Sequence, residues 1–291
     1  MKKSVTPWAF IPTLYLAEGL PYIIINAVST VLYADLGFEN TQIAFWTGWL
    51  YLPWILKMFW SPLVDARGTK RRWLLGAQLG MAVLFLALAL LCAVNAFSFA
   101  AQQNNLTFFT LSLFGFLAGA FISATLDIAT DGYYLLALTP VEQSKFVGIR
   151  TIFYRLAMIL GSGALVSAVG LLRPSLSGAL NWGALFAFLG LVFAAATAYH
   201  YRFLPRPAGD KPAHAAGGPA WGQAFGSYFT QKNMLYILLF ILLYRLGDAL
   251  LEKMVPLFLL KPAAEGALGM SMQNYGLIKG TLGLGAVVAG N

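Results

Sequence analysis

Charged side chains stand inside long apolar runs of this 291-residue chain, and these are the residues that could do chemistry. In LLYRLGDALL, residues 242–251, Arg245 and Asp248 lie three positions apart, which places them on one face of a helix. A charge at the centre of a membrane helix costs about 2.5 to 3.5 kcal/mol on insertion scales, so neither should face lipid. We expect both to face a central cavity, either as a self-paired structural couple or as a solute or proton site.

Two aspartates occupy another apolar run, one helical turn apart. Asp127 and Asp131 share a helix face, where mutual repulsion and a low dielectric disfavour ionisation of both. One of them is expected to hold a proton, which would make the pair a relay. The alternative is that they pair with Arg150 or Arg155 and fix helix packing. The candidates for carrying protons are Asp127, Asp131, Asp248 and, in the first apolar run, Glu18.

Two tyrosine–arginine pairs form the second group of candidates. Arg155 follows Tyr154 as Arg245 follows Tyr244. A guanidinium binds a carboxylate or phosphate through two parallel hydrogen bonds, so all four residues are candidates for binding an anionic solute. For Arg155 the alternative is an ion pair with an aspartate of the preceding run. An arginine that exchanges this aspartate for the solute would fill both roles. Lys279 is a further charge in an apolar run, and its role stays open.

The composition indicates a membrane protein. Hydrophobic residues make up 59% of the chain and charged residues 10%, with a mean hydropathy of +0.71, whereas globular domains carry about 25% charged residues. Most lysines and arginines lie in short connections, so the net charge of +8 indicates membrane topology and not nucleic-acid binding. We find no nucleophile elbow, phosphate-binding loop or cysteine–histidine metal set, and therefore expect no enzyme, no bound metal and no cofactor.

Apolar runs long enough to cross a membrane must position these charges. They predict an all-α polytopic fold with spans at 8–34, 41–63, 73–97, 106–138, 145–172, 178–201 and 234–260, and an eighth from about 272 to the last residue. The predicted organisation is a six-helix transmembrane half (1–201), a linker (202–233) and the start of a second half (234–291).

Basic residues are concentrated on one set of connections, which places the N-terminus and the linker in the cytoplasm. Within the linker, aromatic residues at spacings of three and four predict a short amphipathic helix on the membrane surface: Trp221, Phe225, Tyr228 and Phe229. Glu252 and Lys253 lie nearer the end of their span, so we expect both to reach toward the membrane surface.

The stretch SPLVDARGTKRRW, residues 61–73, combines an acid, a glycine and a basic run. Asp65 can cap or pair near a helix end, and Gly68 permits a reversal of direction. The pattern resembles the signature of the major facilitator superfamily, which implies a gating latch of Asp65, Gly68 and Arg71 at the cytoplasmic helix ends. A plain basic loop is the alternative.

A narrower resemblance runs in order along nearly the whole chain. The strings that carry it are AEGLP (17–21), KMFWSPLVD (57–65), LDIATDGY (126–133), FYRLAMILGSG (153–163), LYRLGDAL (243–250) and KGTLGLGAVVAG (279–290). Together they resemble the AmpG-type muropeptide permeases and their acetyl-CoA transporter relatives. The resemblance implies a monomer of the bacterial inner membrane that imports an anhydro-sugar peptide with protons, driven by the proton gradient and without a cofactor. It also implies that this chain stops inside its eighth helix and does not function alone.

Two alternatives remain open at this point. A carrier of the same superfamily could transport another amphipathic anion, such as acetyl-CoA or a siderophore, because arginines do not identify the molecule. A membrane receptor or scaffold that does not transport is the alternative of another class. The charges within the spans argue against a scaffold, because it has little reason to bear their insertion cost.

Overall fold

A computed structural model describes residues 6–97, 105–172, 178–212, 226 and 230–289. Within these ranges the chain is helical and contains no strand, which confirms the predicted all-α class. Five helical segments of the described chain are long and apolar enough to cross a membrane by length and composition. The predicted amphipathic linker helix falls outside the described residues.

The first span is a helix with a wide turn in its middle. It consists of η1 (Pro7–Ala9), α1 (Ile11–Ile23), the π turn η2 (Ile24–Val28) and α2 (Ser29–Asp35). Pro21 stands inside α1, and a proline cannot donate the backbone hydrogen bond of a regular helix, which favours an irregular turn near it. The wide turn follows directly and is fully buried.

The second span is broken, where a single helix over 41–63 was expected. It consists of α3 (Asn40–Gly48), η3 (Trp49–Tyr51), α4 (Leu52–Leu56), η4 (Lys57–Phe59) and α5 (Ser61–Arg67). Pro53 and Pro62 occupy the first turns of α4 and α5, where their missing N–H groups are tolerated. Each proline therefore starts a new helical segment instead of continuing the preceding one.

The remaining spans follow the predicted apolar runs closely. They are α6 (Lys70–Phe97), α7 (Leu106–Ala137), α8 (Pro140–Ile159) with the π turn η5 (Leu160–Leu165) and α9 (Val166–Leu172), α10 (Gly178–Phe203), α12 (Met234–Leu260), the short turn η7 (Ala263–Glu265) and α13 (Met272–Ala289). Thr139 and Glu142 form a capping box that fixes the start of α8.

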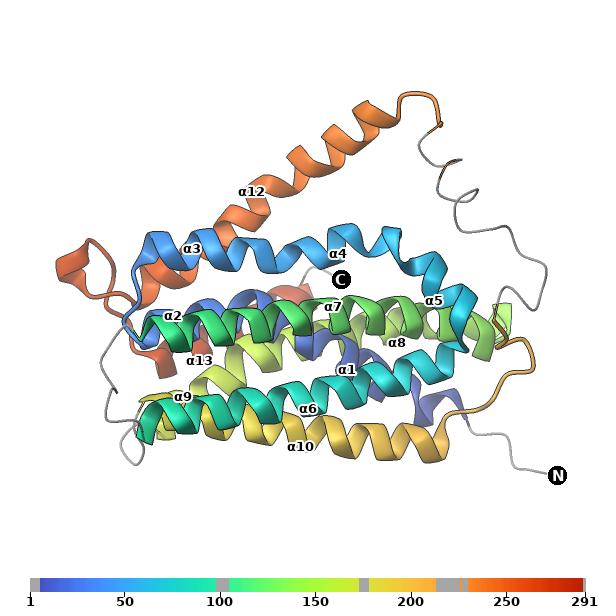
Figure 1. The fold of residues 1–291 in the computed structure, drawn as a ribbon, viewed down its shortest axis with the longest axis horizontal. Helices are drawn as coiled ribbons and strands as arrows, with labels where there is room; N and C mark the ends of the chain where they lie inside the picture. The colour runs from blue at the N-terminus through green and yellow to red at the C-terminus, as the bar shows by residue number, and fades with distance from the viewer. Residues whose placement is uncertain (1–5, 98–104, 173–177, 213–225, 227–229, 290–291) are drawn as a thin grey trace.

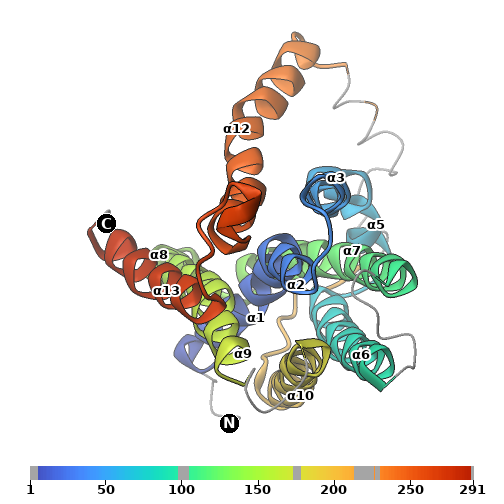
Figure 2. The same ribbon diagram turned by 90° about the vertical axis from the view of Figure 1, so that its left-hand side faces the viewer.

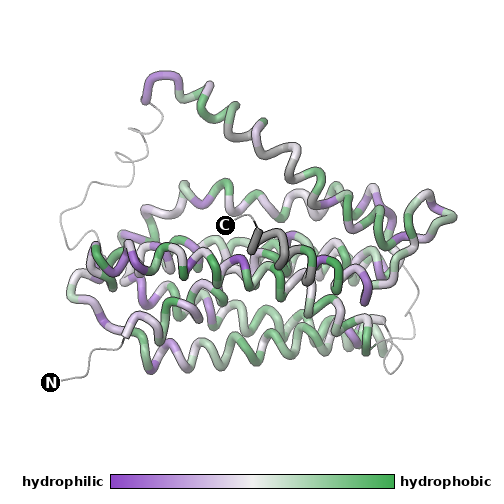
Figure 3. The backbone as a smooth tube through the Cα atoms, turned by 180° about the vertical axis from the view of Figure 1, so that it is seen from behind, coloured by the Kyte–Doolittle hydropathy of each residue, from purple (hydrophilic) through white to green (hydrophobic). Residues whose placement is uncertain are grey.

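Most helices run side by side in one bundle, with α1 near its centre (Figures 1 and 2). Helix α12 packs on α2 and α3 near its C-terminal end, and its N-terminal part points away from the bundle (Figure 1). Apolar colouring dominates the lengths of the helices, and hydrophilic residues gather mainly toward the helix ends (Figure 3). The start of α6 and the end of α10, both with basic residues, lie at the same end of the bundle (Figure 1).

Helix α13 packs against η5 and α9 through glycines that allow close approach of the backbones. A Cβ atom on Gly276 would lie 2.6 Å from the carbonyl oxygen of Gly163 and 2.7 Å from the backbone nitrogen of Ser167. The Ser167 hydroxyl donates a hydrogen bond of 2.9 Å to the carbonyl of Gln273. The 272–289 helix is thus fixed on the first six spans by direct backbone packing.

Two lysines connect the C-terminal helices to carbonyl oxygens of the N-terminal spans. Lys253 is buried and donates to the carbonyl of Asn26 in the π turn η2. Lys261 donates to the carbonyl of Phe38 at 2.9 Å. The expectation that Lys253 reaches toward the membrane surface is therefore wrong, because its amine reaches the Asn26 carbonyl in the wide turn instead. The side chain of Glu252 lies outside the described parts.

The close packing of α13 predicts opposite effects of one substitution at two glycines. Gly276→Ala should destabilise the fold by about 1 to 3 kcal/mol, since its methyl group would overlap the backbone of η5 and α9. Gly148→Ala on α8 has open space around it and should gain up to about 1 kcal/mol of helix stability. Thermal unfolding in detergent measures both, and equal midpoints for the two variants would contradict this packing.

Candidate functional site

Acidic and tyrosine side chains of α1 face the acidic side chains of α7. Tyr15 and Glu18 lie one turn apart on α1, and Asp127 and Asp131 lie one turn apart on α7. The two helices pack against each other in the bundle. This brings two of the predicted proton-carrying residues of α7 next to the third, Glu18.

Asp131 belongs to a group with one cation and one tyrosine. The hydroxyl of Tyr15 donates to Oδ1 of Asp131 at 2.8 Å, and Nη1 of Arg150 lies 3.2 Å from the same oxygen. The Arg150 guanidinium also lies over the rings of Tyr15 and Tyr134, 5.2 and 5.1 Å from their centroids. Arg150 is therefore held by α1 and α7 together, and it leaves Asp131 neutralised.

Asp127 is paired with a different cation. Lys57, in the short turn η4 of the broken second span, forms an ion pair with Oδ2 of Asp127. Each of the two aspartates thus has its own basic partner. The alternative, in which the aspartates pair with cations, describes this geometry, although the partner of Asp127 is Lys57 and not an arginine.

Glu18 is the buried acid of the site. It is 5% exposed, and its carboxyl lies close to that of Asp127. Its second oxygen, Oε2, is buried without a hydrogen-bond partner among the described residues. Two ionised carboxylates that lie close together in a low-dielectric interior repel each other, and one bound proton removes that repulsion.

The three side chains of Glu18, Asp127 and Lys57 are electrically neutral together when one proton is bound. With the proton, one carboxylate and one ammonium remain, and their charges cancel. Without it, two carboxylates share one lysine in a low-dielectric interior, where like charges repel strongly. One proton more or less therefore changes the net charge of these three side chains between zero and minus one.

An aromatic cluster adjoins Glu18 one turn further along α1. The ring of Tyr22 lies 5.2 Å from Trp54, 6.3 Å from Tyr51 and 6.4 Å from Tyr154, measured between centroids. The rings come from α1, η3, α4 and α8, so they line the same region of the bundle. Tyr154, one of the predicted solute-binding residues, belongs to this cluster.

The other predicted solute-binding residues are placed differently. Arg155 is exposed on α8, and Tyr244 is exposed on α12 and stacks on Phe240 at 5.7 Å. The side chains of Arg245 and Asp248 lie outside the described parts of α12. The ammonium of Lys279 lies 5.9 Å from the ring centroid of Tyr275 within α13.

The predicted latch residues make contacts at one end of the bundle, with partners that the sequence did not indicate. Asp65 pairs with Lys70, and Arg71 donates to the carbonyl of Tyr201 at 2.6 Å. Gly68 has extended backbone that any residue adopts, so it is not a left-handed turn. Instead, a Cβ atom at Gly68 would lie 2.9 Å from Nε1 of Trp73.

Asp210 completes the contacts at the start of α6. Its carboxylate accepts hydrogen bonds from the backbone N–H groups of Lys70 and Arg71, at 2.6 and 3.1 Å. An acid at a helix N-terminus is stabilised by the unpaired N–H groups and the helix dipole. The start of the predicted linker is therefore fixed to the bundle.

Sequence reasoning missed Lys57, Tyr15 and Asp210 as members of these groups. Lys57 stands in the apolar run 41–63, so the insertion cost used for Arg245 would have identified it. Tyr15 lies three residues before Glu18, at helical spacing, and could have been found in the same way. Nothing local marks Asp210, because its partner is 140 residues away in sequence.

The donors described here offer no metal site. No group of three or more histidine, cysteine, aspartate or glutamate side chains in the described ranges could hold a metal ion. The acids of the site are instead neutralised by lysine and arginine, as is typical of intramembrane charges.

Comparisons with known proteins agree with this architecture. A sequence model described as the Major Facilitator Superfamily matches residues 13–290. A Rickettsia felis protein named "Putative transporter AmpG 4" is 25% identical over 282 residues, which cover 92% of this chain and 63% of that protein. The "Anhydromuropeptide permease" of Escherichia coli K12 is 27% identical over 283 residues, covering 94% of this chain and 52% of the permease. The chain thus spans about half to two thirds of the length of these relatives.

The Lys57–Asp127 pair predicts a stability effect that a second substitution reverses. Lys57→Met should destabilise the protein by about 1 to 3 kcal/mol, less than for a fully buried pair, because the Lys57 side chain is 38% exposed. Lys57→Met with Asp127→Asn should recover most of that loss. Unfolding midpoints in detergent measure both, with Lys145→Met on the exposed face of α8 as control. A double variant no more stable than Lys57→Met alone would contradict the pairing.

Proposed function

Because this chain belongs to the Major Facilitator Superfamily, we propose that it is part of a secondary active transporter that imports an anhydro-muropeptide together with protons. The observation that carries the proposal is the buried Glu18 carboxyl against Asp127 and Lys57. A scaffold has no need for a buried acid beside a second acid. A proton-coupled carrier needs a buried group that can bind and release a proton. The names of the relatives from Rickettsia felis and Escherichia coli support the solute class.

The coupling that we propose is electrostatic. With a proton bound, a neutral Glu18 carboxyl can donate a hydrogen bond to Asp127, and Lys57 neutralises Asp127. Loss of the proton leaves two carboxylates for one lysine, which disfavours this arrangement of the helices. A proton can therefore shift the population between two arrangements of the bundle, which is what a coupled transporter needs. Asp131 with Arg150, and Asp248 on α12, remain further proton-carrying candidates of the proposal.

The solute that fits this interior has both ring and anionic parts. Trp54, Tyr22 and Tyr154 offer aromatic faces for the apolar face of a sugar ring. Arginines suit the carboxylates of the attached peptide, and Arg155 and Arg245 are the proposed partners. An anhydro-sugar linked to an acidic peptide combines these features, whereas an acid without a ring would leave the aromatic cluster unused.

We also propose an orientation in a bacterial inner membrane. The chain is a multi-pass membrane protein of apolar helices, and the basic connections at 67–72 and 202–211 belong to one end of the bundle. The positive-inside rule places that end and the N-terminus in the cytoplasm. The solute would then enter from the opposite end, where α2 and α3 are joined.

Replacing the buried acid tests the coupling. Glu18→Gln mimics the protonated state and cannot release a proton, so vesicles carrying the whole protein should lose uphill uptake of labelled anhydro-muropeptide. The inside-to-outside ratio should fall to about one, since the proton gradient then supplies no free energy. Exchange of internal for external solute should continue, because it needs no net proton movement.

Glu39→Gln is the matched control, since Glu39 is exposed at the start of α3 and caps no N–H group with its side chain. This variant should accumulate solute like the unsubstituted protein. Uphill uptake retained by Glu18→Gln would remove Glu18 from the coupling. Loss of exchange together with uptake would indicate a misfolded or blocked protein instead of an uncoupled one.

Replacing an aromatic residue tests the solute site. Trp54→Ala removes the ring nearest Tyr22 and should raise the KM for anhydro-muropeptide by about two- to tenfold, since stacking contributes about 0.5 to 1.5 kcal/mol. Trp46→Ala on the exposed face of α3 should leave the KM unchanged. Equal KM values for both variants would exclude the cluster from solute binding, and a lower maximal rate alone would assign Trp54 to the transport motion.

A further inference from the structure

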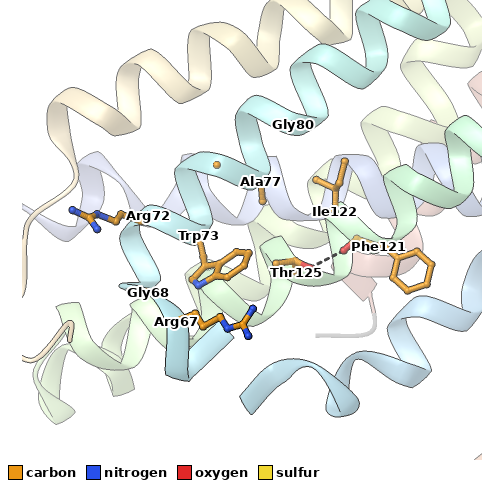
Figure 4. A pocket seen from close by; sticks show the side chains of 10 residues that line it. Arg67, Gly68, Arg72, Trp73, Ala77, Gly80, Phe121, Ile122 and Thr125 are labelled. Atoms are coloured by element: carbon orange, nitrogen blue, oxygen red, sulfur yellow. Dashed lines mark hydrogen bonds between the residues drawn. The ribbon is translucent and has the colours of Figure 1, made fainter. Parts of the chain in front are cut away.

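A groove outside the polar interior lies between α5, α6 and α7. Its volume is about 420 Å³, within the range of about 300 to 1,000 Å³ common to small-molecule pockets. The residues that carry the argument are Arg67, Arg72, Trp73, Gly76, Gly80 and Phe121 (Figure 4). None of them belongs to the groups around Glu18 and Asp131.

The floor of the groove is apolar and open. A Cβ atom on Gly76 would meet nothing within 4 Å, and at Gly80 it would meet only the side chain of Ile122 at 3.5 Å. Phe121, on α7, borders the same groove and is 43% exposed. A flexible hydrocarbon chain can follow such a floor because no polar group on it needs a partner.

The mouth of the groove is basic. Arg67 and Arg72 border it and are exposed, but Arg72 points away from Trp73 (Figure 4). Nε1 of Trp73, beside them, is buried without a hydrogen-bond partner among the described residues. In Figure 4 the Arg67 guanidinium lies beside the Trp73 indole. A ligand here would therefore be anionic at its head, with an oxygen that accepts from an indole N–H.

The helices that border the groove, α5, α6 and α7, lie on the side of the bundle opposite α13 (Figure 2). Apolar side chains of α5 and α6 are exposed, with Leu63 at 37%, Leu79 at 53% and Val83 at 61%. Such a surface on a membrane-spanning bundle faces lipid. Basic pockets between helices at the cytoplasmic side of a membrane suit anionic lipid headgroups.

We propose that this groove binds one anionic diacyl phospholipid of the cytoplasmic leaflet. Its phosphate lies against Arg67, an ester oxygen accepts from Trp73, and one acyl chain lies along Gly76 and Gly80. The inference depends on the proposed function only for the leaflet, because the groove and its charges are independent of the solute. A bound lipid would brace α5 against α6, the two helices that carry Asp65 and Lys70.

Native mass spectrometry of the purified protein tests this proposal. Titration with phosphatidylglycerol should give one tightly retained lipid, and phosphatidylcholine should be retained less. Arg67→Gln should weaken phosphatidylglycerol binding about fivefold, the effect of one basic residue near a lipid headgroup. Arg202→Gln, an exposed arginine at the end of α10, is the charge control and should bind like the unsubstituted protein.

A second variant addresses the acyl chain. Gly76→Leu should fill the floor and abolish tight retention, whereas Gly148→Leu, in open space on α8, should leave it unchanged. Equal retention of phosphatidylglycerol and phosphatidylcholine, or full retention by Gly76→Leu, would overturn the proposal. Displacement of the lipid by glycerol phosphate alone would overturn it too, because the site would then bind a free phosphate. Uptake plays no part in these readouts, so they fail or succeed independently of the proposed transport.

Discussion

The ion pair between Lys57 and Asp127, beside the buried carboxyl of Glu18, sets the main constraint on this bundle. A membrane-spanning interior offers no water to solvate a charge, so every ionised group must have a partner. Asp127 has Lys57, whose short turn η4 interrupts the second span at the level of the site. Three segments that are distant in sequence must therefore meet at one point, and the surrounding packing has to allow it.

Irregular backbone occurs where the C-terminal helices contact the N-terminal spans. The π turn η2 includes Asn26, whose carbonyl accepts from Lys253 of α12, and η5 holds Gly163, against which α13 packs. Single wide turns in membrane helices are tolerated when protein groups satisfy the backbone that they leave unpaired. The C-terminal helices are thus attached to the N-terminal spans at places where regular helix geometry is relaxed.

The sequence predicted the spans well because apolar length and charge placement are local signals. The limits of α12, residues 234–260, agree with the predicted span, and the family assignment is confirmed by the match over residues 13–290. Partner choice was harder to predict, because it depends on which helix faces which. Two aspartates one turn apart indicate repulsion, and only the fold shows that Lys57 and Arg150 reach them from different sides. Gly68 likewise looked like a turn residue, whereas the indole of Trp73, five residues later, is what requires it.

The bonds from Asp210 to the start of α6 also affect how the two parts of the chain are tethered. With residue 210 fixed, the contour length available before α12 begins at Met234 is at most roughly 80 Å. A limit of that length alone leaves the position of α12 only weakly restrained. The register between the two parts is therefore set by the lysine-to-carbonyl bonds and the α13 packing, and the covalent connection contributes mainly a high local concentration.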